Sequence, residues 1–323
     1  MIARLSFIAI SFCCLVLTAQ ADTQRGVAAY ERGDFAAAVK ELTPPAEQGD
    51  ATAQTLLGVV YGIGSKAMPR DDKKAFGWFR RAAEQGSPVA EDFLGEAYLN
   101  GLGVAIDRTE AVTWFRRSAE QGYAIGQFHL AVAYGAGSGV KRDAKTAVAW
   151  LEKSAAQDFA PAEEMLGRFY IAGFGVAVDE KLGVQWLRKA ANQGLATAQA
   201  GLGVAYANGV GTRRDKVQAF KWLELALRGL DPGKLRSQIL PLHKTLAGAL
   251  TPAQRQRADA EVAKFEPKIK VGKRVGRAAT RQASEPELAA PIATGSGFVI
   301  SAEGHIVTND HVVAGCGHMR VRH

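Results

Sequence analysis

The strongest constraint on the fold is a repeat of 36 residues that is marked by all five tryptophans of the chain. They are Trp78, Trp114, Trp150, Trp186 and Trp222. Asp71, Asp107, Asp143, Asp179 and Asp215 keep the same period, and Tyr61, Tyr98, Tyr134, Tyr170 and Tyr206 follow it with one extra residue in the first interval. A period of this length indicates a stacked array of supersecondary units. We therefore expect an all-α repeat solenoid.

Each unit contains two helical patterns, and the second is clearest in residues 107–122, DRTEAVTWFRRSAEQG. Its apolar and small residues recur at the spacing of one helical face. Asp107 is placed to cap the helix, Glu110 to complete a capping box, and Gly122 to end it. The first helix of each unit is rich in Ala and Gly. The glycine-rich turns between the helices predict positive φ and not phosphate binding, because no strand precedes them.

The consensus A-x-A-Q-x-x-L-G-x-x-Y-x-x-G-x-G-V, then Asp, then A-x-x-W-x-x-x-A-A-x-x-G resembles the Sel-one-like repeat, a relative of the tetratricopeptide repeat. Five units cover 51–230, and 22–50 is predicted to be an N-terminal capping repeat kinked by Pro44-Pro45. Ala131, Asp158 and Lys66 depart from glycine positions. The resemblance implies a right-handed α/α superhelix whose concave face binds proteins or peptides, without cofactor or catalysis. The recurring Trp and Tyr are interpreted as packing residues.

Residues 1–21 are predicted to be a signal peptide, because Arg4 precedes an apolar run from Leu5 to Leu17 and Ala19-Gln20-Ala21 follows it. A membrane anchor is the alternative, but a span requires about 20 apolar residues. Cleavage after Ala21 predicts a secreted or periplasmic protein without a membrane span. It would retain Cys316 as its one cysteine.

After the repeats, 231–265 is predicted to form C-terminal capping helices and 266–291 a basic linker. In the last helix Thr251 is the expected N-cap, and its apolar face is predicted to contain Ala253, Ala260, Val262 and Phe265. The basic cluster from Lys268 to Arg281 is interpreted as a solvated tether. The formal charge of +8 comes from basic residues scattered among acidic ones, so we expect no nucleic-acid partner.

Residues 292–323 change character: GSGFVI and HIVTN predict a short C-terminal β-hairpin. With TN-x-HVV, they resemble the start of trypsin-like serine peptidases of the HtrA-like branch. That resemblance makes His311 the catalytic general base and the hairpin part of an incomplete trypsin-like β-barrel. Asp310 is not the triad carboxylate. The sequence GCGHMRVRH that follows, residues 315–323, provides no Ser, Asp or Glu, so this chain is expected to be inactive.

Metal binding is an alternative interpretation of the C-terminal segment. His305, His311, His318 and His323 with Cys316 fit no zinc spacing, and no metal is expected. His129 and His243 are interpreted as structural or solvent-facing. The protein is then either the N-terminal part of an exported serine endopeptidase, with the array recruiting partners, or a stand-alone periplasmic interaction scaffold with an inert tail. Coding DNA beyond His323 would distinguish them.

Overall fold

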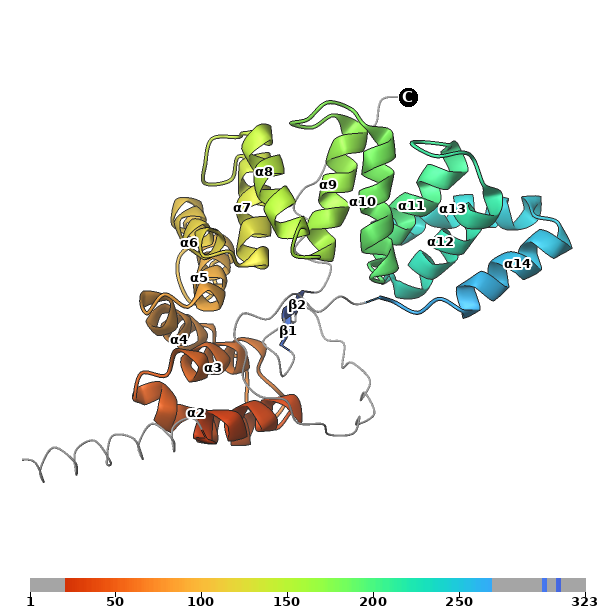
Figure 1. The fold of residues 1–323 in the computed structure, drawn as a ribbon. Helices are drawn as coiled ribbons and strands as arrows, with labels where there is room; N and C mark the ends of the chain where they lie inside the picture. The colour runs from red at the N-terminus through yellow and green to blue at the C-terminus, as the bar shows by residue number, and fades with distance from the viewer. Residues whose placement is uncertain (1–20, 269–297, 301–305, 309–323) are drawn as a thin grey trace, which may run out of the picture. The chain divides into compact units, whose positions relative to one another are not determined.

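The computed structural model describes residues 21–268, 298–300 and 306–308, and apart from two short strands these residues form helices and turns. Residues 21–31 are helical. The labelled helices (Figure 1) are α2 Phe35–Glu47, α3 Ala51–Ile63, α4 Asp72–Glu84, α5 Pro88–Asn100, α6 Arg108–Glu120, α7 Ala124–Ala136, α8 Ala144–Ala155, α9 Ala160–Ala172, α10 Glu180–Asn192, α11 Ala196–Asn208, α12 Lys216–Gly229, α13 Lys234–Ala249 and α14 Pro252–Ala263.

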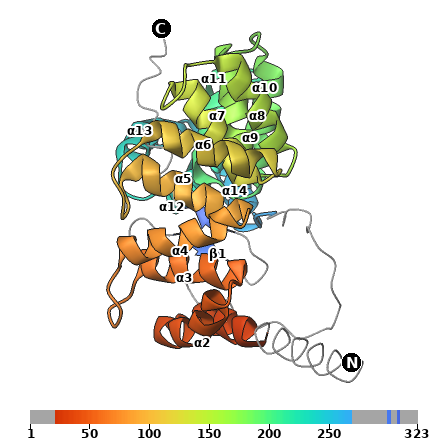
Figure 2. The ribbon, with the colours of Figure 1, turned by 90° about the vertical axis from the view of Figure 1, so that its left-hand side faces the viewer.

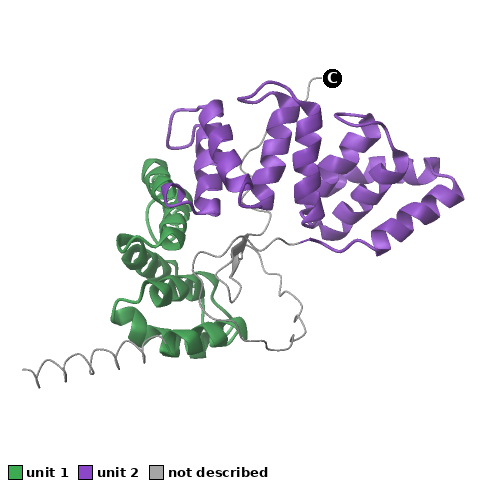
Figure 3. Ribbon diagram, viewed as in Figure 1, with its two compact units in different colours: residues 1–118, 275–323 green, residues 119–274 purple. Residues whose placement is uncertain are grey.

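The chain divides into two compact units, one of residues 1–118 with 275–323 and the other of residues 119–274 (Figure 3). Within each unit, consecutive helices form hairpins that stack side by side (Figures 1 and 2). The predicted all-helical repeat array is confirmed for the described residues. The right-handed superhelix stays a prediction.

The repeated aspartates cap the second helix of each repeat, as the sequence predicts. The Asp143 carboxylate accepts hydrogen bonds from the backbone N–H groups of Lys145 and Thr146, at 3.0 and 3.1 Å. These bonds lower the pKa of Asp143, because the amide dipoles stabilise the charged carboxylate. Asp71, Asp107, Asp179 and Asp215 accept equivalent bonds.

Only half of the capping box predicted for Glu110 is found: the backbone N–H of Glu110 donates to Asp107 Oδ1 at 3.0 Å. The Glu110 carboxylate instead accepts a hydrogen bond from the Trp114 indole Nε1–H at 2.9 Å. The backbone N–H of Asp107, which the box would have used, donates to the Tyr98 carbonyl at 2.9 Å. The capping box is found at the start of α14, where Thr251 and Gln254 each bond the other's backbone N–H.

Buried glutamines link one repeat to the next, a feature that the sequence prediction missed. Gln127 Nε2 donates to the Ala119 carbonyl at 3.2 Å, and Gln157 Nε2 donates to Gln127 Oε1 at 2.9 Å. The same pairing recurs in Gln54 with Ala46 and Gln85, in Gln199 with Ala191, and in Gln193 with Glu163. These side chains satisfy carbonyls near helix ends that lack an intrahelical partner.

The turn glycines have the predicted positive φ, and some also allow close approach. Gly211 has φ of +60°, and a Cβ there would collide with the carbonyl of Glu180. Glycine is required because any side chain would separate the turn from the start of α10. Asp158 takes φ of 60° where other units have glycine, a conformation that Asp tolerates better than most residues.

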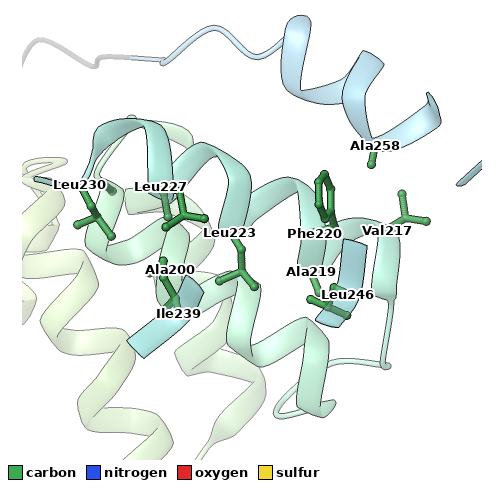
Figure 4. Close-up of a cluster of buried hydrophobic side chains, with 12 residues drawn as sticks. Ala200, Val217, Ala219, Phe220, Leu223, Leu227, Leu230, Ile239, Leu246 and Ala258 are labelled. Atoms are coloured by element: carbon green, nitrogen blue, oxygen red, sulfur yellow. The ribbon is translucent and has the colours of Figure 1, made fainter. Parts of the chain in front are cut away.

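The capping helices close the apolar face of α12 (Figure 4). Ile239 and Leu246 of α13 and Ala258 of α14 join the cluster that contains Phe220 and Leu223. The predicted apolar face of α14 is wrong in part, because Ala258 and Val262 are buried whereas Ala253 and Ala260 are exposed. α2 runs as one helix through Pro44 and Pro45.

Strands β1 Phe298–Ile300 and β2 Ile306–Thr308 pair antiparallel, with Val299 opposite Val307. The residues between them lie outside the described residues, as does His311. The complete hairpin and its origin in a trypsin-like barrel therefore stay predictions. Within residues 21–268, no helix is long and apolar enough to cross a membrane.

Candidate interaction surface

A partly exposed tryptophan lies on the second helix in four of the five repeats. Each indole has a cation from the residue three positions later over its ring. The distances to the ring centroid are 4.7 Å for Arg81 over Trp78, 4.7 Å for Arg117 over Trp114, 3.8 Å for Lys153 over Trp150 and 3.9 Å for Lys189 over Trp186. Such contacts hold a positive charge beside an aromatic surface.

These tryptophans are positioned by helix packing, as the sequence interpretation expected. Trp114 contacts the core of α4 and α5, and Trp150 contacts the core of α7, α8 and α9. The second helix is also tied to the first: Ser118 Oγ donates to the Pro88 carbonyl at 2.6 Å, and Ser154 Oγ to the Ala124 carbonyl at 2.7 Å. One side of the Trp114 and Trp150 indoles is therefore positioned by packing.

The charged residue that contacts the recurring tyrosine differs between repeats. Tyr170 Oη donates to Glu152 Oε1 at 3.1 Å, and Arg188 Nη2 donates to Tyr206 Oη at 2.9 Å. Burial, followed by the nearby Glu152 carboxylate, raises the pKa of Tyr170. Equivalent positions thus carry opposite charges in neighbouring repeats, as expected where packing does not determine the residue.

The fifth tryptophan differs, because the chain that leaves α14 covers it. Trp222 is 5% exposed, and the Phe265 ring meets it edge-on with centroids 5.6 Å apart. Pro267 lies against Gly194, and the Lys268 backbone N–H donates to the Asn192 carbonyl at 2.8 Å. We call residues 265–268 the exit segment.

A cavity of about 300 Å³ lies along the exit segment. It is lined by Asn192, Lys221, Glu261, Lys264, Phe265, Glu266 and Lys268. Lys221 Nζ forms an ion pair with Glu261 at 3.3 Å and lies 4.8 Å from the Trp222 ring centroid. Acidic and basic side chains thus surround an aromatic contact at this place.

The two histidines of the helical part lie among packed side chains. His129 is buried in α7. His243 stacks on Phe220 with ring centroids 4.5 Å apart, and its Nε2 lies 2.9 Å from Glu224 Oε2. Burial lowers the pKa of His243, and Arg255 adds to this effect while Glu224 opposes it. Among the described residues, no group of His, Cys, Asp or Glu is arranged to hold a metal ion.

Comparison with protein families identifies the repeats. The model described as "Sel1 repeat" matches residues 51–87, 88–123, 124–159, 160–195 and 196–229. Together these five matches cover more than half of the chain and agree with the five predicted units.

Among solved structures, a Sel1 repeat protein from Oxalobacter formigenes is 31% identical, with a TM-score of 0.61 over 70% of this chain and 65% of that one. A protective antigen of uropathogenic Escherichia coli is 26% identical over 80% of this chain and 73% of that one, with a TM-score of 0.36. The ERAD-associated E3 ubiquitin-protein ligase component HRD3A of Arabidopsis thaliana is 32% identical over 82 residues, 25% of this chain and 12% of that protein. The chain therefore spans only a small part of this curated relative.

Proposed function

The chain belongs to the Sel1 repeat family, and from that membership we propose that its helical array is a scaffold that binds other proteins. The observation that carries this proposal is that structural residues recur in every repeat whereas surface charges differ between repeats. The residues that recur every 36 positions pack, cap or turn the helices. Charge instead changes at surface positions such as the exposed Glu152 and the partly buried Arg188. Repeat arrays bind partners with such variable surface positions.

Two further points support binding to protein. The array already holds a non-helical piece of polypeptide, the exit segment, by a backbone hydrogen bond and two side-chain contacts. The Arabidopsis relative is named as a component of a ligase. As the family resemblance implies, we place the binding face on the concave side of the array.

In the test, the full chain is immobilised and exposed to an extract of its source cells. Each protein that it retains is then purified and mixed with the chain to reconstitute a complex. A true partner forms a complex of fixed stoichiometry in sedimentation experiments. Reversing the charges at Glu152 and Arg188 should weaken that complex. Reversal at Arg213, an exposed loop residue, is the matched control. The scaffold proposal fails if no purified candidate forms a saturable complex with the wild-type chain.

We also propose that the array is the N-terminal part of an exported trypsin-like serine endopeptidase, in which His311 is the general base. The support is the sequence from Thr294 to Cys316 and its resemblance to the HtrA-like branch. A serine nucleophile requires a histidine base and a carboxylate that orients it. Coding DNA that continues in frame to a Gly-x-Ser-Gly motif would support this proposal, and a stop codon after His323 would refute it.

The same proposal predicts that the chain as printed does not cleave casein or a fluorogenic peptide. The residues after His311 include neither a serine nor an acidic residue. Labelling by a serine-directed covalent probe would contradict this expectation.

Export after removal of residues 1–21 is part of the proposal. Packing begins shortly after this point: Thr23 Oγ1 donates to Asp50 Oδ2 at 2.8 Å, and Arg25 Nε bonds Glu41 Oε2 at 2.9 Å. Mass spectrometry of the protein from its source cells should find Asp22 at the N-terminus. An intact Met1 would contradict export by cleavage.

A further inference from the structure

The exit segment shows how one repeat holds a non-helical stretch of chain. Three contacts hold it: Phe265 meets the Trp222 indole, Pro267 covers Gly194, and the Lys268 N–H bonds the carbonyl of Asn192, the last residue of α10. A tryptophan, the glycine 28 residues before it and the end of the preceding second helix therefore form one peptide seat.

The same parts recur in earlier repeats. Trp150 has Gly122 and the end of α6 at Glu120, and Trp114 has Gly86 and the end of α4 at Glu84. Each of these two sets lies within a single compact unit. A Cβ placed on Gly86 or Gly122 meets no atom within 4 Å among the described residues, whereas one on Gly194 is 3.1 Å from Pro267 Cβ.

The fourth repeat provides a natural exception. Trp186 is paired with Asp158, whose side chain stands where the other seats have glycine. A proline cannot approach the turn there as Pro267 approaches Gly194. This seat should not accept the same peptide.

At the Trp150 seat, the Gln157 side-chain amide donates to the Gly122 carbonyl at 2.9 Å and leaves the Cβ side of the glycine uncovered. The charges near these two seats indicate the middle residue of a ligand. Arg117 and Lys153 lie over Trp114 and Trp150, whereas the position three residues after Trp222 is Leu225. In the exit segment, Glu266 stands between the aromatic residue and the proline and lines the cavity together with three lysines. An acidic residue at that place would be favoured beside Arg117 or Lys153.

We propose that the Trp114–Gly86 and Trp150–Gly122 seats bind extended segments of a partner protein with the pattern aromatic–acidic–proline. The inference rests on the proposed scaffold function and names the class of segment bound. The aromatic ring meets the indole edge-on, as Phe265 meets Trp222, the proline covers the glycine turn, and the backbone N–H after the proline bonds the helix-end carbonyl. In the terminal repeat, the exit segment already occupies the seat formed by Trp222 and Gly194.

The test uses the full chain with ¹⁵N-labelled tryptophan, in which each indole N–H gives its own NMR signal, assigned with single Trp→Phe variants. The probe is the peptide AKFEPK, residues 263–268 of this chain, with blocked ends. We expect saturable shifts of the Trp114 and Trp150 signals and no shift of the Trp186 signal. The control peptide AKAEAK should shift none of them. Lys153→Glu should weaken the response of Trp150 about fivefold and leave that of Trp114 unchanged.

A second variant tests the terminal seat directly. Phe265→Ala with Pro267→Ala removes the two covering side chains, so the Trp222 signal should then shift when the peptide is added. If Trp222 responds in this variant but Trp114 and Trp150 never respond, the seat is specific to the terminal repeat and the inference is wrong. Equal shifts of all signals, Trp186 included, would also overturn it. A purified partner that binds without perturbing Trp114 or Trp150 would refute the seats and leave the scaffold function intact.

Discussion

Trp150 and Trp222 occupy the same position in two repeats of one compact unit, yet their surroundings differ. Trp150 is partly exposed under the Lys153 ammonium, whereas Trp222 is 5% exposed and covered by Phe265. The first belongs to a repeat with further repeats on either side, and the second to the last repeat. A terminal repeat has no following repeat to cover it, so its stability depends on chain that carries none of the repeat pattern.

The largest difference between the two regions is expected in their cores. Leu166 lies in the middle of the array and is 0% exposed, whereas Leu246 in the cap is 7% exposed. Leu166→Ala should lower the free energy of unfolding by about 4 kcal/mol and Leu246→Ala by about 2 kcal/mol, because the cap can relax around the cavity.

Urea unfolding followed by far-ultraviolet dichroism measures both losses. Leu246→Ala should mainly release α13 and α14, which gives an early transition of small amplitude. Equal losses with a single shared transition would show that the cap and the repeats are one cooperative element.

A smaller difference in stability is expected between substitutions of two glycines in the same compact unit. Gly122 has φ of +89° with open space for a Cβ, whereas a Cβ on Gly211 meets the Glu180 backbone. Gly122→Ala should cost about 1 kcal/mol for the left-handed backbone alone. Gly211→Ala should cost clearly more, because the turn must also move away from α10. Thermal unfolding of the two variants compares them, and an equal decrease in Tm would contradict the role of close approach.

The smallest effect is a pH dependence that is confined to the cap. The pKa of His243 is lowered in the folded protein by burial and by Arg255, against the opposing effect of Glu224. The unfolded chain therefore binds the proton first as the pH falls below about 6.5, and the cap loses stability below that pH.

Hydrogen exchange at pH 7 and pH 5.5, corrected for intrinsic rates, measures this change. Amides of α13 and α14 should lose protection at the lower pH, and those of α8, which contains no histidine, should not. His243→Gln should remove the difference. An equal loss of protection in α8 would assign the effect to other groups.

Much of the fold follows from spacing. The 36-residue period predicted the helix pairs, the aspartate caps and the positive φ of the turn glycines, because each depends on residues close together in the chain. The role of Glu110 was mispredicted, since Trp114 competes for the carboxylate that a local rule gave to the backbone. The face of α14 was mispredicted because its packing depends on the shape of α12.

The glutamine network was visible as repeated letters but not as a structure. Gln127 and Gln157 recur at fixed places in the consensus, yet their bond crosses between helices 30 residues apart in sequence. The peptide seats are similar: the sequence analysis assigned every tryptophan to packing, which is correct for one side of each indole. Exposure of the other side depends on what the rest of the chain covers.

The sequence alone therefore determined the repeat, its length, its pairs of helices and its family resemblance, because these depend on local propensity and on periodic burial. The tertiary structure decided which of five equivalent tryptophans is covered, which glycines face open space and where the exit segment lies. These features depend on contacts between residues far apart in sequence, and five nearly identical repeats give no local sign of which surface another part of the chain will cover.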